Sequence, residues 1–127
     1  ASARSVDTTA VLAAVQHETL DPDRNIFRRG DRLAAGLATL ESLWDEVRQH
    51  AWGTDGTELR TRETAAMLAT ARWSLASALA RDESRGMHQR TDRPQTRVDL
   101  DRRLVSGGLE RAWTRFEPAT DSLEMAS

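Results

Sequence analysis

Residues 31–52 read DRLAAGLATLESLWDEVRQHAW and carry the clearest structural signal in the chain. The large apolar residues of this stretch recur at spacings of 4, 3, 4 and 3, at Leu33, Leu37, Leu40, Trp44 and Val47. This spacing places all of them on one face of an α-helix. Asp31 can cap the start of the helix and Gly53 can end it. The stretch therefore predicts an amphipathic helix over residues 31–52.

Two further helices are predicted, one before this stretch and one after it. Residues 7–20 follow the N-cap candidate Asp7 and stop before Asp21-Pro22, because proline disfavours helical geometry in the residue that precedes it. Residues 57–83 are rich in Ala and place apolar residues on one side of a helix, with Arg72 outside that side. This apolar side consists of Leu59, Ala66, Met67, Ala71, Leu75, Ala78 and Leu79. Because only a short turn separates the second helix from the third, the two are expected to run antiparallel.

The helical pattern ends at Gly86. This glycine is expected to take the left-handed conformation that terminates the third helix. Residues 87–101 predict an extended segment. Residues 103–106 and 112–116 are expected to pair as a short hairpin around Gly107-Gly108.

The sequence therefore predicts a mainly α fold in a single domain over residues 1–127. We expect a three-helix antiparallel bundle over about residues 7–86, an extended segment with a short β-hairpin over about 87–116, and a tail over 117–127. The chain has no cysteine, which excludes disulfides and iron–sulfur ligation within it. Its formal net charge of −2 provides no general attraction to nucleic acid or to anionic lipid.

Charge and hydropathy also bound the location and the partners. No apolar run approaches the roughly 20 residues that a membrane span needs. We therefore expect a cytoplasmic protein that inserts no segment into a membrane and associates with one only through partner subunits. The stretch from Arg81 to Arg103 holds seven Arg, but five acidic residues lie among them. Interleaved charges favour pairing within the chain over binding to nucleic acid.

Two patterns resemble metal sites only in part. The sequence Asp21-x-Asp23-x-Asn25 opens like a calcium loop, but Ile26 stands where such a loop needs Gly. A polar turn is the better interpretation, with Ile26 and Phe27 anchored in the core. The three histidines offer no pair on one helix face: His17, His50 and His88. We expect no metal site and no catalytic residue.

The tryptophans leave two interpretations open. Trp44 lies on the apolar face of the second helix and is expected in the core. Trp73 and Trp113 can either pack locally or form an apolar patch that another body covers.

Residues 80–94 read ARDESRGMHQRTDRP and follow an Ala-rich helix. This sequence resembles a signature of the flavoprotein subunits of succinate dehydrogenase and fumarate reductase, and of L-aspartate oxidases, in which R-x-E-S-R-G-x-H is followed by x-R-x-D-x-P. Every fixed position of the signature is present, at Arg81, Glu83, Ser84, Arg85, Gly86, His88, Arg90, Asp92 and Pro94. The stretch Asn25–Arg28 and the glycine hairpin also resemble this family, so the resemblance extends from about Val6 to Phe116.

The resemblance implies a three-helix bundle that follows FAD-binding and capping domains in a longer polypeptide. It implies a C-terminal structural domain of an FAD-dependent oxidoreductase of the succinate or fumarate type, which packs against the flavin-binding domain and catalyses nothing alone. An iron–sulfur subunit is left open as a further partner. The chain lacks the G-x-G-x-x-G dinucleotide fingerprint, so we transfer no catalytic, cofactor-binding or metal-binding residue to it.

The role of the signature has two interpretations. In the first, it fastens the bundle to the flavin-binding domain, for which Arg85 offers bidentate hydrogen bonding. In the second, it only ends the helix and orders the segment that follows, with Arg85 or His88 bound to carbonyls at the helix end. A free-standing helical protein–protein interaction module is the alternative to the enzyme domain, and a small Arg-rich nucleic-acid binder ranks last.

Overall fold

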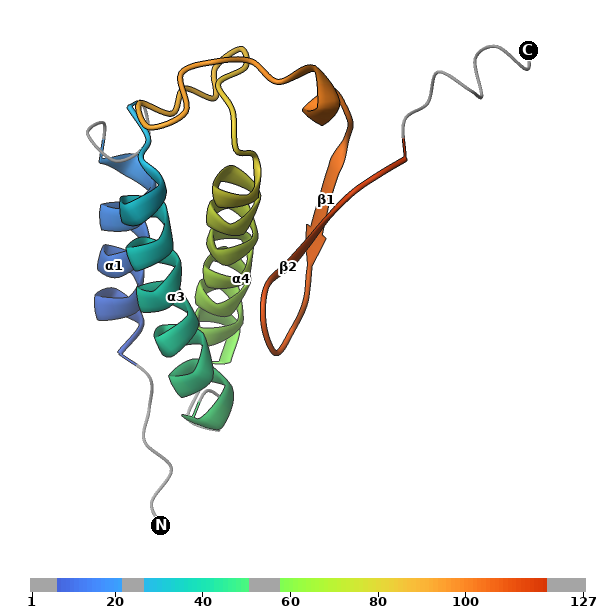
Figure 1. Ribbon diagram of the computed structural model, residues 1–127. Helices are drawn as coiled ribbons and strands as arrows, with labels where there is room; N and C mark the ends of the chain where they lie inside the picture. The colour runs from blue at the N-terminus through green and yellow to red at the C-terminus, as the bar shows by residue number, and fades with distance from the viewer. Residues whose placement is uncertain (1–6, 22–26, 51–57, 119–127) are drawn as a thin grey trace.

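A computed structural model describes residues 7–21, 27–50 and 58–118. Within these ranges the elements are α1 (Thr8–Leu20), α3 (Gly30–His50), α4 (Glu58–Ala80), a single 3-10 turn (Val98–Leu100), β1 (Leu104–Gly107) and β2 (Trp113–Phe116). The three helices lie side by side with alternating directions, and the hairpin runs along the side of α4 (Figure 1). The predicted mainly α fold with a short C-terminal hairpin is confirmed.

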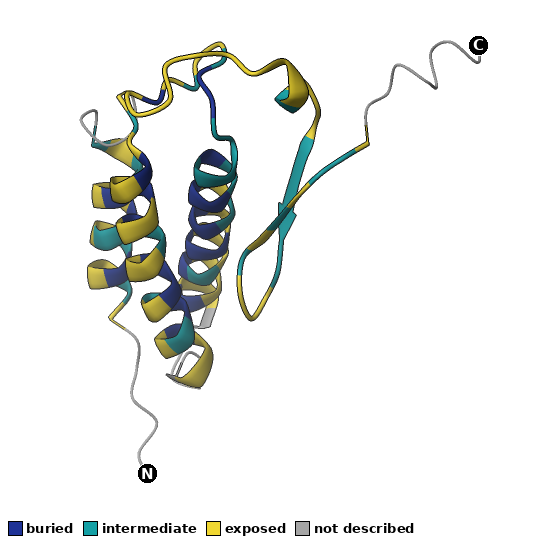
Figure 2. Cartoon of the chain, viewed as in Figure 1, coloured by how far each residue is buried: buried dark blue, intermediate teal, exposed yellow. Residues whose placement is uncertain are grey.

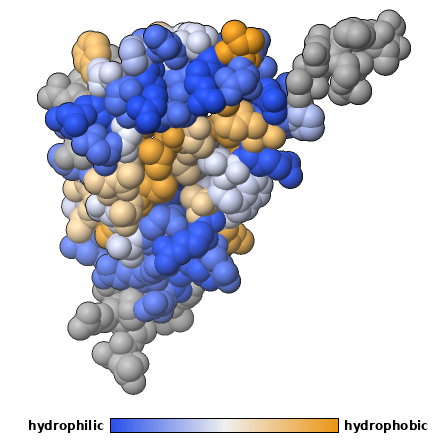
Figure 3. Space-filling model, viewed as in Figure 1, coloured by the Kyte–Doolittle hydropathy of each residue, from blue (hydrophilic) through white to orange (hydrophobic). Residues whose placement is uncertain are grey.

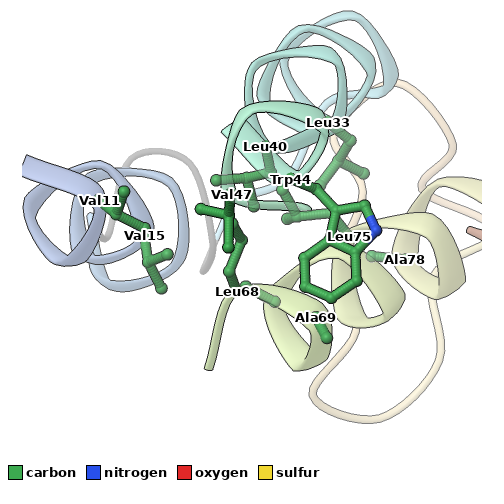
Figure 4. Packing of buried hydrophobic residues seen from close by; sticks show 11 residues of the cluster. Val11, Val15, Leu33, Leu40, Trp44, Val47, Leu68, Ala69, Leu75 and Ala78 are labelled. Carbon is green, nitrogen blue, oxygen red and sulfur yellow. The ribbon is translucent and has the colours of Figure 1, made fainter. Parts of the chain in front are cut away.

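The first helix begins where its polar cap predicts. The Asp7 carboxylate accepts a hydrogen bond of 3.1 Å from the backbone N–H of Ala10, which satisfies a donor that the helix leaves unpaired. Val11 and Val15 are the buried apolar residues of α1. They point from α1 toward the other two helices in Figure 4.

The predicted apolar face of the second helix is confirmed in α3. Four of its members are buried and Leu37 is partly buried, the four being Leu33, Leu40, Trp44 and Val47. The predicted start is confirmed to within one residue, since α3 begins at Gly30. The predicted cap is wrong, because Asp31 lies inside the first turn and pairs with the side chain of Arg29 at 3.0 Å. The expected end at Gly53 lies outside the described residues.

The third helix, α4, is central, since it packs against α1, α3 and both strands. Dark blue buried positions therefore follow it on several sides in Figure 2. The single apolar side predicted for this helix is partly wrong. Leu68 also lies on that side and is fully buried, although the prediction omits it, while Leu59 and Met67 are exposed. Ala69 and Ala76 are buried outside that side. A helix with neighbours on three sides buries more than one stripe.

Arg72 is the largest departure from the pattern. It was expected outside the apolar side, yet it is fully buried against α3. Its Nε donates to the carboxylate of Glu41, and its guanidinium lies 4.6 Å from the ring centroid of Trp44. A buried positive charge is tolerated where a carboxylate and an aromatic face both stabilise it.

The hairpin forms in the predicted region, with Leu104 opposite Phe116 and Gly107 opposite Trp113. Its turn is held on the bundle by two indole N–H groups. Trp44 donates to the carbonyl of Leu109, and Trp73 donates to the carbonyl of Gly108 at 3.0 Å. Trp73 therefore packs locally.

Two large aromatic side chains, Phe27 before α3 and Trp113 in β2, are exposed to solvent. Phe27 is 62% exposed, so the predicted anchoring of this residue in the core is wrong. Its predicted companion Ile26, like the calcium-like stretch beside it, lies outside the described residues. Trp113 is about half exposed on the outer side of β2.

Candidate docking site in the loop after the third helix

Residues 81–97, here called the motif loop, contain all nine positions of the signature. The loop starts with a tight turn in which the backbone N–H groups of Arg85 and His88 each bind the other's carbonyl, at 2.7 and 2.9 Å. Gly86 occupies this turn with φ +56°, a conformation that costs other residues energy. The left-handed glycine is confirmed, but its predicted place at the helix end is wrong, because α4 already ends at Ala80.

Glu83 is the centre of the motif loop and is fully buried. Its Oε2 accepts hydrogen bonds from Arg81 at 2.6 Å and from Arg85 Nε at 3.0 Å. Its Oε1 accepts from Arg85 at 3.1 Å and from the backbone N–H of Arg97 at 2.8 Å. One carboxylate thus joins the beginning of the loop to its end.

The charge state of Glu83 follows from these contacts. Burial by itself raises the pKa of a carboxyl group, but the hydrogen bonds from Arg85, from the Arg97 backbone and from Arg81 outweigh it and lower the pKa of Glu83 to about 2. The group is therefore a carboxylate at neutral pH. It accepts hydrogen bonds from two guanidinium groups and one backbone N–H, and so holds Arg81, Arg85 and Arg97 together.

Ser84 organises the second half of the loop from a buried position. Its hydroxyl accepts a hydrogen bond from the backbone N–H of Arg90 at 2.9 Å and lies 2.8 Å from the carbonyl of Arg93. Its own backbone is bound as well, by the carbonyl of Gln95 at 3.0 Å and the hydroxyl of Thr96 at 2.6 Å. The polar groups of this non-helical segment are thus satisfied within the loop.

Arg90 and Asp92 connect two helix ends. The buried guanidinium of Arg90 donates to the carbonyl of Leu79 at 3.0 Å, in the last turn of α4. It also binds Asp92 through two hydrogen bonds, at 3.1 and 2.7 Å. Asp92 in turn accepts from the backbone N–H of Gly30, the first residue of α3, at 2.9 Å. A cation therefore lies at a helix C-terminus and an anion at a helix N-terminus, where each complements the helix dipole.

These contacts lower the pKa of Asp92. The hydrogen bonds from Arg90 contribute most, the backbone N–H of Gly30 adds to them, and together they outweigh the opposing effect of burial and bring the pKa to about 2. The cap of α3 thus comes from residue 92 and not from the predicted Asp31. Gly30 leaves the space for it, since a Cβ here would lie 2.8 Å from the Asp92 carboxylate and still closer to Arg90.

His88 is held in one tautomer. A guanidinium nitrogen of Arg28 lies 2.7 Å from Nδ1, which must accept because the guanidinium can only donate. Nε2 therefore carries the proton and donates to the carbonyl of Arg81 at 3.0 Å. Burial, with the charges of Arg28, Arg90 and Arg81, lowers the pKa of His88 against the opposing effect of the Arg81 carbonyl. The ring is a neutral structural link.

Comparison with known proteins shows the family to which the sequence belongs. Residues 16–106 match the model of the family described as "Fumarate reductase flavoprotein C-term", and this range contains the whole motif loop. The chain belongs to this family. The resemblance seen in the signature is thereby confirmed.

Two curated relatives are similar to this chain. The first is a subunit of the fumarate reductase (CoM/CoB) from Methanothermobacter marburgensis, which is 32% identical over 93 residues that cover 70% of the chain and 17% of the relative. The second is L-aspartate oxidase from Rhodospirillum rubrum, which is 40% identical over 78 residues that cover 61% of the chain and 24% of the relative. The chain thus spans less than a quarter of the length of these relatives.

The family signature is used mainly inside the domain. Arg85, expected as a link to another domain or to the helix-end carbonyls, binds Glu83 and donates to the carbonyl of Arg97 at 2.8 Å. His88 binds the carbonyl of Arg81, just past the helix end, as the second interpretation predicted. Pro94 is exposed after the second turn, where no backbone donor is needed.

The residues that the sequence analysis missed are the partners of the signature. Arg28, Gly30 and the backbone of Arg97 complete its hydrogen bonds. Their only sequence signal is a pair of polar, glycine-containing segments beside predicted helices. Nothing in the local sequence pattern predicts that residues 28–30 and 88–92 are in contact.

The described parts of the chain offer no candidate for a metal centre. No group of three or more His, Cys, Asp or Glu residues in them could hold a metal ion. None of the described helices combines the length and the apolar character that crossing a membrane requires. What the motif loop can do chemically is to hold backbone and side chains in fixed positions.

Proposed function

We propose that the chain is the C-terminal domain of an FAD-dependent oxidoreductase of the succinate dehydrogenase and fumarate reductase type, and that the motif loop docks it on the flavin-binding domain. The observation that carries the proposal is a contrast. The polar groups of the loop are paired with one another, whereas two apolar side chains, one in the loop and one directly after it, are exposed to solvent. Met87 is 94% exposed and Val98, directly after the loop, is 88% exposed.

The polar network supports this role because it fixes the loop before any partner arrives. A loop held by Glu83, Ser84 and Arg90 loses little conformational entropy on docking, which favours a stable interface. Large apolar side chains at the tip of such a loop are exposed to water unless another body covers them. We therefore keep the interpretation that the signature fastens the bundle to the flavin-binding domain, in a modified form. Arg85 orders the loop, and the loop makes the contact.

A second surface supports docking on the same body. In Figure 3, an apolar band crosses the middle of the face formed by the helices and the hairpin, between hydrophilic side chains at either end. A groove on α3 and α4 has an apolar part at Leu37 and Leu79 and a charged part in which Arg111 of the hairpin turn pairs with Glu41 and Asp45. Apolar surface of this kind is typical of contacts between domains.

The relatives support the assignment to an enzyme. Both relatives have the names of oxidoreductases, and each is much longer than the part that aligns with this chain. We assign to the complete polypeptide FAD as cofactor, hydride transfer between flavin and a succinate-like substrate, and a cytoplasmic location. An iron–sulfur subunit remains a further partner of this proposal.

The test uses the complete polypeptide. Met87→Asp and Val98→Asp are expected to lower the FAD retained per protein after gel filtration, and to speed proteolytic cleavage between the domains. The matched control is Leu59→Asp, at a similarly exposed apolar residue at the opposite end of α4. In the 127-residue chain alone, all three variants should melt like the wild type. Unchanged flavin content and cleavage in both tip variants would contradict the proposal.

A further inference from the structure

A groove of about 680 Å³ runs between α4 and β1, and Arg81 and His88 of the motif loop line one end of it. Its floor is the face of α4 that carries Thr70, Trp73, Ser74 and Ser77. Ser106 of β1 adds a hydroxyl from the opposite side. The floor therefore combines short hydroxyl side chains with one indole.

The end of the groove nearest the motif loop is positively charged. Arg28, Arg81 and Arg103 line it, and none of the described residues that line the groove carries a carboxylate. The neutral ring of His88 adds no charge and holds Arg28 in place.

The arginines of the groove differ in how far they are engaged. Arg81 shares the buried Glu83 with Arg85, which also lies 3.6 Å from Asp101. The side chain of Arg103 is 80% exposed, and its ion pair with Glu117 is long, at 4.0 Å. The ion pair of Arg103 is therefore weaker than that of Arg81.

We propose that this groove receives an acidic segment of the flavin-binding domain. Asp or Glu side chains of the segment meet Arg81 and Arg103, and its backbone meets the hydroxyl groups of Ser74 and Ser77. Charge complementarity selects an acidic occupant, because three Arg and no carboxylate are among the described lining residues, and the open groove can admit a length of chain. The inference rests on the proposed function and specifies the chemistry of the partner.

The groove lies on the same body as the motif loop, so one docking event can fill both. Arg81 belongs to both features, because its guanidinium binds Glu83 and the carbonyls of Leu100 and Arg102 while it lines the groove. Because these hydrogen bonds fix the guanidinium of Arg81, they also fix its position in the lining of the groove. Arg103 is the side chain best placed to report on the occupant, because it has few internal contacts.

The experiment places a photo-crosslinking amino acid, benzoylphenylalanine, at Ser74 in the complete polypeptide with FAD bound. The same group at Met87 reports on docking by the loop, and at the exposed Ala13 of α1 it serves as a control. Mass spectrometry identifies the crosslinked peptides. The expected result is a Ser74 crosslink to a flavin-domain segment rich in Asp and Glu. Arg103→Glu should weaken this crosslink by about fivefold or more, whereas Arg62→Glu, on an exposed turn of α4, should leave it unchanged.

The outcomes separate the two proposals. A Met87 crosslink to the flavin-binding domain, with Ser74 crosslinking only within this chain or to a segment without acidic excess, would overturn the groove and leave the docking role standing. Loss of interdomain crosslinks at both positions would overturn both. A Ser74 crosslink that Arg103→Glu does not weaken would show that charge does not select the occupant, and would also reject the inference.

Discussion

The helical core and the motif loop are ordered by different physical means. In the core, Leu40 and Leu68 are fully buried among apolar neighbours from all three helices, as Figure 4 illustrates for most of the cluster. In the motif loop, the fully buried side chain is a carboxylate, and its neighbours are guanidinium and backbone N–H groups. The comparison teaches that a segment without regular secondary structure can be fixed by satisfying its polar groups instead of burying apolar ones.

The two regions should therefore respond to different perturbations. Apolar packing depends on the volume of the side chains and is insensitive to pH. The loop depends on the charge of Glu83 and Asp92, so protons and charge-neutralising substitutions act on it. A substitution in one region should therefore leave the other region unchanged.

The largest effect is expected from a cavity in the core. Leu40→Ala should lower the free energy of unfolding by about 3–4 kcal/mol, because it removes a fully buried side chain between helices that cannot collapse around the gap. Urea denaturation at neutral pH measures this. Leu20→Ala, at an exposed position on α1, is the matched control and should change little. A loss below about 1 kcal/mol in Leu40→Ala would show that the core is loosely packed.

The next effect is expected from neutralising the centre of the loop. Glu83→Gln keeps the shape but leaves Arg81 and Arg85 facing an uncharged group, at a cost of about 3 kcal/mol. Glu117→Gln, at the long surface pair with Arg103, is the control and should be nearly neutral. A similar loss in both variants would contradict the central role of Glu83.

The pH dependence sharpens this prediction. Glu83 has a folded pKa of about 2 against an ordinary value of 4.5, so its contribution is complete above about pH 4.5 and is lost as the pH falls toward 2. The stability difference between the wild type and Glu83→Gln should shrink over this range. The difference caused by Leu40→Ala should stay constant while the protein remains folded. Equal pH profiles for the two variants would remove the distinction between the regions.

A smaller effect is expected at the link between the helix ends. Asp92→Asn keeps an acceptor for the Gly30 N–H but removes the charge that binds Arg90, so we expect a loss of about 1–2 kcal/mol. Hydrogen exchange should rise most in the first turn of α3. Asp99→Asn, in an exposed pair with Arg97, is the control and should leave that turn protected. Unchanged exchange in the first turn of α3 in Asp92→Asn would show that the charge of Asp92 does not stabilise this helix end.

The smallest effect is expected at the first turn of the loop. Gly86→Ala has room for its methyl group but must adopt φ near +56°, which costs about 1 kcal/mol. Met87→Ala, at the neighbouring exposed position, should not change the melting temperature of the chain. Equal melting temperatures for Gly86→Ala and the wild type would show that the turn accepts another backbone conformation.

The sequence predicted the parts of the molecule that depend on local spacing. The face of α3 followed from a helical period, and the hairpin followed from two short runs around glycines. The burial of Arg72 was not predictable in this way, because it depends on Glu41 and Trp44 of another helix. Periodicity describes one helix at a time, and α4 has neighbours on several sides.

The candidate site was recognisable as a sequence pattern, but its contacts were not. The nine signature positions marked the loop, whereas their roles depend on segments distant in the chain. Asp92 caps α3 across 62 positions of sequence, and Arg28 orients His88 across 60. The predicted antiparallel order of the second and third helices brings these segments to one end of the bundle, but which residues pair there depends on the path of the loop in the folded structure.

The attachment of the hairpin turn gives the molecule an internal optical reporter. The indoles of Trp44 and Trp73 both donate to carbonyls of that turn. Detachment of the turn would expose these rings to water and move their fluorescence emission to longer wavelength, while the helices keep their circular dichroism. The rate at which the hairpin detaches can thus be measured separately from unfolding of the bundle, without any added dye.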